Sequence, residues 1–225
     1  MTSPPRHQLE RHVLKYCALL HQRGWVANHD GNITARLAPD TLIATPTAFS
    51  KAEIKQQHLI TIDLDGNKLT GQEKGFSELN LHTYVYRQRE DVGAVLHSHS
   101  PHATALAVMG LTVEPRILPE SVVSLGSSIP LIPYAAPKSP ASTLNLAPFV
   151  QDVDVVTLEN HGVLAWGPDL ETAYLRMELV EHLATIQLHT GTPDGCRIIP
   201  DKDITTCLLA RSKAGLGPQG RAIKK

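Results

Sequence analysis

Apolar positions along this chain follow two spacings, one typical of helices and one typical of strands. From residue 5 to 23, apolar side chains recur three or four positions apart, and Gly24 follows them as a stop signal. The same spacing predicts further helices over residues 77–89, 101–110, 139–151 and 169–188. Alternating or continuous apolar runs predict strands over residues 33–37, 41–45, 91–99, 152–158 and 163–167, with a hairpin over 58–71.

Strands and helices are mixed along the chain, and we find no internal repeat and no linker. This order predicts a single α/β domain with a mixed sheet over residues 1–189. Residues 190–225 lose the apolar pattern and end in GLGPQGRAIKK. We therefore expect a C-terminal tail there that is mobile or packs on a neighbouring subunit.

Charge and composition exclude several classes of protein. The 225 residues include 21 basic and 22 acidic ones, so the net charge of −1 offers no general attraction to nucleic acid or to an anionic membrane. No apolar run approaches the roughly 20 residues of a membrane span, and the N-terminus lacks an apolar signal core. Three widely spaced cysteines argue for a reducing compartment. A cytoplasmic protein is expected.

Histidine is over-represented, with 12 residues, and two histidines end the predicted strand over 91–99. In a strand, residues two apart point to the same side, so His97 and His99 converge while Ser98 faces away. Such a pair suits a zinc ion, but two histidines bonded to backbone carbonyls at a sheet edge would give the same pattern. His102 belongs to the next helix and is expected to be a surface or pocket residue.

Two further residues complete a candidate metal site. His161 follows the strand over 152–158 in a tight turn that Gly162 allows, so neighbouring strand ends could present three histidines to one ion. Three protein ligands with an open position are typical of catalytic zinc. Glu78 begins the helix over 77–89, where a carboxylate could serve the site or simply favour the helix start.

Five stretches resemble the class II aldolase/adducin-head family, which contains sugar-phosphate aldolases and 4-epimerases. The matching stretches, which fall between residues 10 and 189, are GNIT (31–34), TPTAFS (45–50), FSE (76–78), HTYVYRQREDVGAVLHSHSPHATALA (82–107) and ENHGVLAWG (159–167). Their order and spacing are far more specific than any one of them alone.

The resemblance implies a three-layer α/β/α fold around a central, largely antiparallel mixed sheet. It implies one zinc ion per chain on His97, His99 and His161, with Glu78 as the catalytic acid/base. It also implies a homotetramer with active sites at subunit interfaces. Residues that match the family's phosphate-binding positions are Asn32, Thr45, Thr47 and Ser77.

The sequence departs from the family at three places. Ala48 stands where the family's TPTG loop has glycine, and Phe76 replaces one of two serines before the glutamate, so a non-phosphorylated substrate becomes plausible. Neither of the two tyrosines associated with catalysis in the aldolase has a counterpart. Weak candidates for the proton donor are Glu120, Tyr134 and His102.

These observations predict a zinc-dependent aldolase-type lyase that cleaves a small ketose or ketose 1-phosphate through a metal-bound enediolate. A sugar-phosphate 4-epimerase, a 3-oxo-sugar-acid phosphate decarboxylase or a dehydratase could use the same site. An adducin-head-like interaction module without chemistry is the alternative of another class, although such a scaffold has no need of the three histidines and Glu78 together.

Overall fold

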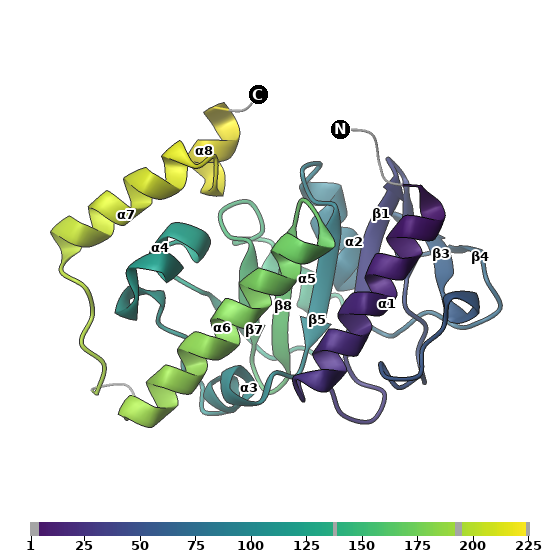
Figure 1. The fold of residues 1–225 in the computed structure, drawn as a ribbon, viewed down its shortest axis with the longest axis horizontal. Coiled ribbons are helices and arrows are strands. Elements are labelled where there is room, and N and C mark those ends of the chain that lie inside the picture. Colours follow the sequence, from purple (N-terminus) through teal and green to yellow (C-terminus); the bar gives the residue numbers. More distant parts are fainter. Residues whose placement is uncertain (1–4, 137–138, 192–194, 224–225) are drawn as a thin grey trace.

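A central mixed sheet organises the chain in this computed structural model, which describes residues 5–136, 139–191 and 195–223 (Figure 1). Its eight strands lie in the order β4-β3-β2-β1-β5-β8-β7-β6. Neighbours pair antiparallel except for β6 and β7, which pair parallel. The strands are β1 Asn32–Ala38, β2 Thr41–Ala44, β3 Ile60–Asp63, β4 Lys68–Thr70, β5 Ala94–Ser98, β6 Leu131–Ile132, β7 Val155–Leu158 and β8 Gly162–Gly167.

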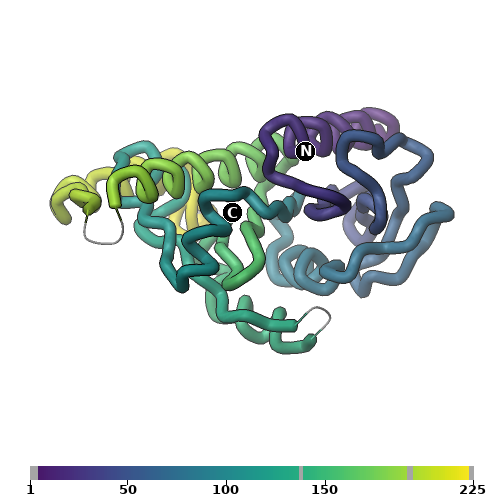
Figure 2. Tube along the Cα trace, turned by 90° about the horizontal axis from the view of Figure 1, so that it is seen from below, coloured from purple at the N-terminus to yellow at the C-terminus, as the bar shows by residue number. Residues whose placement is uncertain are grey.

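Helices cover both faces of the sheet and make three layers, which confirms the predicted α/β fold. α1, α3 and α6 pack over one face, around a core that includes Val13, Ile33, Leu96 and Met177. α2 and α5 pack over the other face against residues such as Trp166. Figure 2 shows α1 and α6 along the same side. The helices are α1 Arg6–Gln22, α2 Leu79–Gln88, α3 Pro101–Val108, α4 Pro119–Leu125, α5 Ala141–Leu146, α6 Leu170–Thr190, α7 Asp201–Lys213 and α8 Gly217–Ile223, with short 3₁₀ turns at Gln56–His58 and Pro115–Ile117.

Strand register brings distant parts of the chain to one end of the central strands. Asn32 at the start of β1 pairs with His97 near the end of β5. Ser98 pairs with Val163 of β8, and Leu158 of β7 pairs with Gly162 across a tight turn. The end of β5, the start of β1 and the turn between β7 and β8 therefore meet at the same end of these strands.

The C-terminal segment differs from the expected tail. Residues 201–223 form α7 and α8, and α7 lies beside α4 of the same chain (Figure 1). The apolar pattern missed these helices because α7 buries little: Ile204 and Arg211 are its buried residues. The segment is held largely by charge, since Arg211 and Arg221 both reach the buried Asp154.

Asp154 is the centre of a buried ion cluster before β7. Its carboxylate is 1% exposed and lies 2.8 to 3.3 Å from four arginines, Arg89, Arg176, Arg211 and Arg221. Burial by itself would raise the pKa of Asp154, but the arginines outweigh it and hold the pKa below its usual range. The stabilisation that this carboxylate supplies is therefore present at neutral pH and is lost as the pH falls through the lowered pKa.

No helix within the described residues, α6 included, combines the length and the apolar character of a membrane span.

Replacing Asp154 with alanine should lower the free energy of unfolding by about 3–5 kcal/mol, because it leaves buried guanidinium groups without their counter-charge. Urea denaturation would measure the loss. The matched control is Asp91→Ala, since that carboxylate pairs with Arg89 but is 47% exposed, and its removal should cost about 1 kcal/mol or less. Equal losses in the two variants would contradict the central role of Asp154.

Candidate metal centre

Three histidines from two neighbouring strand ends meet at one end of the central strands. His97 is the penultimate residue of β5, His99 directly follows the strand, and His161 lies in the turn between β7 and β8. One ring nitrogen from each lies within 4.8 Å of the others, and the ring centroids are 4.7 to 5.0 Å apart. The structure thus brings together the three residues that the sequence singled out, and their nitrogens could hold one metal ion.

Glycine at position 162 allows this close approach. A Cβ atom on Gly162 would lie 2.3 Å from the carbonyl oxygen of Ser98 and 3.1 to 3.2 Å from ring carbons of His99 and His97. Asn160, two residues earlier, adopts the left-handed conformation (φ 54°) that asparagine tolerates better than most residues. The Asn-His-Gly turn therefore places His161 against the end of β5.

Polar contacts on the far side of the ring orient two of the histidines, His97 and His99. His97 Nδ1 donates to the carbonyl oxygen of Val163 at 2.9 Å, so the lone pair of this neutral ring is on Nε2. Burial lowers the pKa of His97 to about 4, which favours the neutral form. His99 Nδ1 lies 3.4 Å from a carboxylate oxygen of Asp30, the arrangement that orients many metal-binding histidines.

The donor set fits a cation. His97 Nε2 and His99 Nε2 are 3.1 Å apart. His97 Nδ1 donates away from the site, so His97 Nε2 presents its lone pair to His99 Nε2. A proton or a metal ion between the two nitrogens would satisfy this contact.

Glu78 lies against the histidines at the start of α2. Its Oε1 accepts a hydrogen bond from His161 Nε2, its Oε2 accepts one from Asn32 Nδ2 at 2.8 Å, and Oε2 lies 3.7 Å from His97 Nε2. Burial opposes ionisation, but His97, His161 and Asn32 outweigh it and hold the pKa of Glu78 far below its usual range. The carboxylate makes no capping hydrogen bond, so helix-start chemistry does not account for its place.

Only one of the four residues expected to bind phosphate lies at the centre. Asn32 contacts Glu78, and its Oδ1 is buried without a hydrogen-bond partner among the described residues. Thr45 is fully buried and uses its hydroxyl within the fold, where it accepts from the backbone N–H of Ile33 at 3.1 Å. Thr47 and Ser77 are exposed, and their role in phosphate binding remains a prediction.

The motif could not show that the Thr45 side chain turns into the fold, and a role for Thr45 in phosphate binding stays a prediction. In the same loop, Ala48 adopts φ 63°, a left-handed conformation that suits glycine. Alanine adopts this conformation at a cost in backbone strain.

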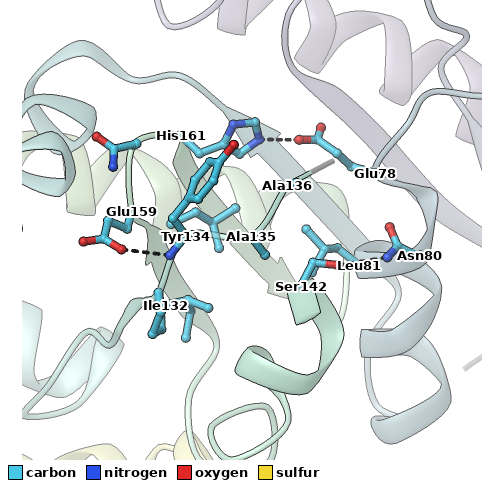
Figure 3. A pocket seen from close by; sticks show the side chains of 13 residues that line it. Glu78, Asn80, Leu81, Ile132, Tyr134, Ala135, Ala136, Ser142, Glu159 and His161 are labelled. Carbon is cyan, nitrogen blue, oxygen red and sulfur yellow. Dashed lines mark hydrogen bonds and ion pairs between the residues drawn. The ribbon is translucent and has the colours of Figure 1, made fainter. Parts of the chain in front are cut away.

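A cavity of about 240 Å³ opens beside Glu78 and His161 (Figure 3). It has apolar walls, and polar groups from the loop after β6 and the turn after β7 also line it. Tyr134, one of the three candidate proton donors, lines this cavity and is 57% exposed. His102 instead pairs with Glu181 at 2.8 Å, and Glu120 is exposed in the first turn of α4.

Asp30 is a residue of the site that the sequence analysis missed. The signal was present, since Asp30 directly precedes the Gly31-Asn32 turn. An aspartate in a turn is ordinary, however, and only the fold shows that it faces His99.

The fold and the site define an α/β protein with a cluster of three histidines at one end of its central strands. Residues 11–188 match the model of the class II aldolase and adducin N-terminal domain, and the chain belongs to this family. The chain is 34% identical to the L-fuculose phosphate aldolase of Methanocaldococcus jannaschii, over 80% of this chain and 95% of that protein. It is 28% identical to the enzyme of the same name from Escherichia coli K12, over 94% and 97% of the two chains.

Solved structures agree with this placement. YgbL from Escherichia coli superposes with a TM-score of 0.82 at 28% identity, over 89% of this chain and 97% of that one. Its structure is described as that of a candidate aldolase, epimerase or decarboxylase. An L-fuculose 1-phosphate aldolase superposes with a TM-score of 0.84 at 24% identity, over 93% and 97% of the two chains, and shows the shared fold. The named relatives support an aldolase-type lyase.

Gly162→Ala should weaken metal binding by about 10-fold or more, because the added Cβ pushes the β7–β8 turn away from His97 and His99. Titration with zinc against a competing chelator would measure it. The control is Gly66→Ala in the β3–β4 turn, where an added Cβ would meet no atom within 4 Å, so zinc affinity should not change. Wild-type affinity in Gly162→Ala would show that the turn adjusts freely.

Proposed function

We propose that this protein is a zinc-dependent lyase of the aldolase type that cleaves a small ketose or a ketose 1-phosphate. One observation carries the proposal: a partly buried, ionised Glu78 lies among three histidines whose nitrogens converge on one point, beside an open cavity. The aldolase relatives at 28% and 34% identity support the same reaction class.

The chemistry needs a base and a stabilised anion. Cleaving the bond between the carbon next to the ketone and the following hydroxyl-bearing carbon releases an aldehyde and leaves an enediolate. His97, His99 and His161 would hold a divalent ion, which would supply the Lewis acidity that stabilises the anion. The neutral imidazoles leave that Lewis acidity largely intact.

Glu78 handles the proton. As a carboxylate it accepts the proton of the hydroxyl whose oxygen becomes the aldehyde oxygen, and it returns the proton to the enediolate carbon. Atoms and charge balance without another reactant: one ketose gives one ketone and one aldehyde. Asn32 holds Oε2 of the carboxylate at 2.8 Å and thereby fixes the direction from which the base acts.

Two other reactions pass through the same enediolate, and both are named in the description of a relative. The description of YgbL includes decarboxylase and epimerase activities, so a 3-oxo-sugar-acid phosphate decarboxylase is the second candidate. Glutamate at position 78, where the epimerase has aspartate, makes the epimerase the weaker one.

We also propose a cytoplasmic homotetramer with active sites at subunit interfaces. Tyr134 is 57% exposed although it lines the cavity, so a neighbouring subunit could cover it and contribute groups to the site.

Purified protein should contain about one zinc ion per chain, and His97→Ala should lose it, because the most deeply buried of the three ligands is removed. Elemental analysis would measure the content. His102→Ala is the control: it removes a nearby histidine that pairs with Glu181 instead, and should keep the metal. Protein that is fully stable without metal would favour the non-catalytic interaction module.

Glu78→Gln should keep the fold and most of the metal but lower kcat by about 100-fold or more, since an amide cannot accept the proton. Aldehyde release from a panel of ketoses and ketose 1-phosphates gives the measurement, and carbon dioxide release from 3-oxo sugar acids tests the second candidate. Glu171→Gln, at the start of α6, is the matched control and should stay active. Undiminished turnover in Glu78→Gln would exclude this residue as the acid/base.

A further inference from the structure

Three polar side chains lie one turn apart on the buried face of α2. Glu78, His82 and Tyr86 are spaced by four residues and so share one face of the helix. Below them lie Asn32 and Thr34, two residues apart on β1 and therefore on one face of the sheet. Glu78 contacts Asn32 at 2.8 Å, while His82 and Tyr86 both contact the Thr34 hydroxyl, at 2.9 and 3.1 Å.

Counting protons in this row assigns the tautomer of His82. The single hydroxyl proton of Tyr86 goes to the backbone carbonyl of Thr34 at 2.9 Å, so the Tyr86 oxygen accepts the proton of the Thr34 hydroxyl. With its own proton used, the Thr34 oxygen must accept from His82 at 2.9 Å. His82 therefore carries its proton on Nδ1 and a lone pair on Nε2.

The remaining nitrogen makes this histidine unusual. His82 is 0% exposed, and its Nε2 has no hydrogen-bond partner among the described residues. Burial, together with the charge of His97, lowers the pKa of His82 to about 3, so the ring stays neutral. A buried polar atom without a partner destabilises a fold, and an apolar side chain here would avoid that cost. Packing alone does not explain a histidine at this position.

The position of Glu78 gives a reason. Glu78 directly precedes α2 and makes no capping hydrogen bond. The position of α2 on the sheet therefore determines where the Glu78 carboxylate lies. Leu81 and Val85 hold α2 to the sheet by apolar contact, which has no preferred direction. The hydrogen bond from His82 to Thr34 is directional and lies one turn from Glu78.

We propose that His82 is a positioning residue. Its hydrogen bond to Thr34 fixes the position of α2 against β1 and so holds the Glu78 carboxylate against Asn32 and the three histidines. The catalytic part of this inference rests on the proposed function, in which Glu78 is the acid/base. The structural part stands without it.

Two variants test the catalytic part. His82→Leu removes both ring nitrogens and should lower kcat about 10-fold or more at similar KM and zinc content, since a base displaced by even a fraction of an ångström works poorly. Its melting temperature should stay level or rise, because the unpartnered nitrogen is gone. His82→Asn can still donate to Thr34 from near the Nδ1 position and should recover most of kcat.

Thr34→Val removes the acceptor from the other side. It should reproduce the loss in kcat, and the double variant should be no worse than either single one, because both remove the same hydrogen bond. Wild-type kcat in His82→Leu would overturn the proposal. So would a loss of kcat that merely follows the melting temperature and is not recovered by asparagine.

Two readouts do not depend on activity. Nitrogen NMR of the purified full chain should show His82 protonated at Nδ1 and bare at Nε2, and the opposite tautomer would overturn the assignment. A crystal structure of His82→Leu or Thr34→Val should show Glu78 Oε2 farther from Asn32 Nδ2 than the 2.8 Å found here. An unchanged distance would overturn the positioning role. If the wild-type protein cleaves no ketose, the proposed function fails while these two measurements still decide the role of His82.

Discussion

Two imidazole nitrogens that face each other at 3.1 Å are the constraint on which the rest of this site depends. His97 donates from its other nitrogen to a backbone carbonyl, and His99 directs its other nitrogen at Asp30. Both rings are thus oriented with their Nε2 atoms toward the same point. The fold maintains this close approach by strand pairing and by the glycine at position 162, where any side chain would collide with the end of β5. Imidazole nitrogens held this close suit a shared proton or a shared metal ion.

A carboxylate lies at each end of the central strands, and the two carboxylates have different kinds of partner. At one end Asp154 meets four arginines that come from separate parts of the chain, so its charge is fully paired and ties the C-terminal helices to the body. At the other end Glu78 meets two histidines and an amide, partners that can release it when a proton or a ligand arrives. The first arrangement suits permanent structure and the second suits chemistry.

The row of polar contacts between α2 and β1 connects this chemistry to the fold. Helix packing by apolar side chains tolerates small shifts, whereas an acid/base must lie within a few tenths of an ångström of its place. Hydrogen bonds that join Thr34 to His82 and to Tyr86 supply the direction that apolar contact lacks.

Much of the fold and the metal centre could be predicted from the sequence because they depend on local periodicity. Alternation along β5 placed His97 and His99 on one side, and the turn around Gly162 indicated that His161 would follow a second strand end. Other contacts between distant segments could not be predicted. Asp30 acquires its role only by facing His99, Thr45 turns its hydroxyl into the sheet, and α7 and α8 attach through Arg211 and Arg221 instead of an apolar stripe. Periodicity reports which face of an element is apolar, but the partner of a buried polar atom is set by three-dimensional packing alone.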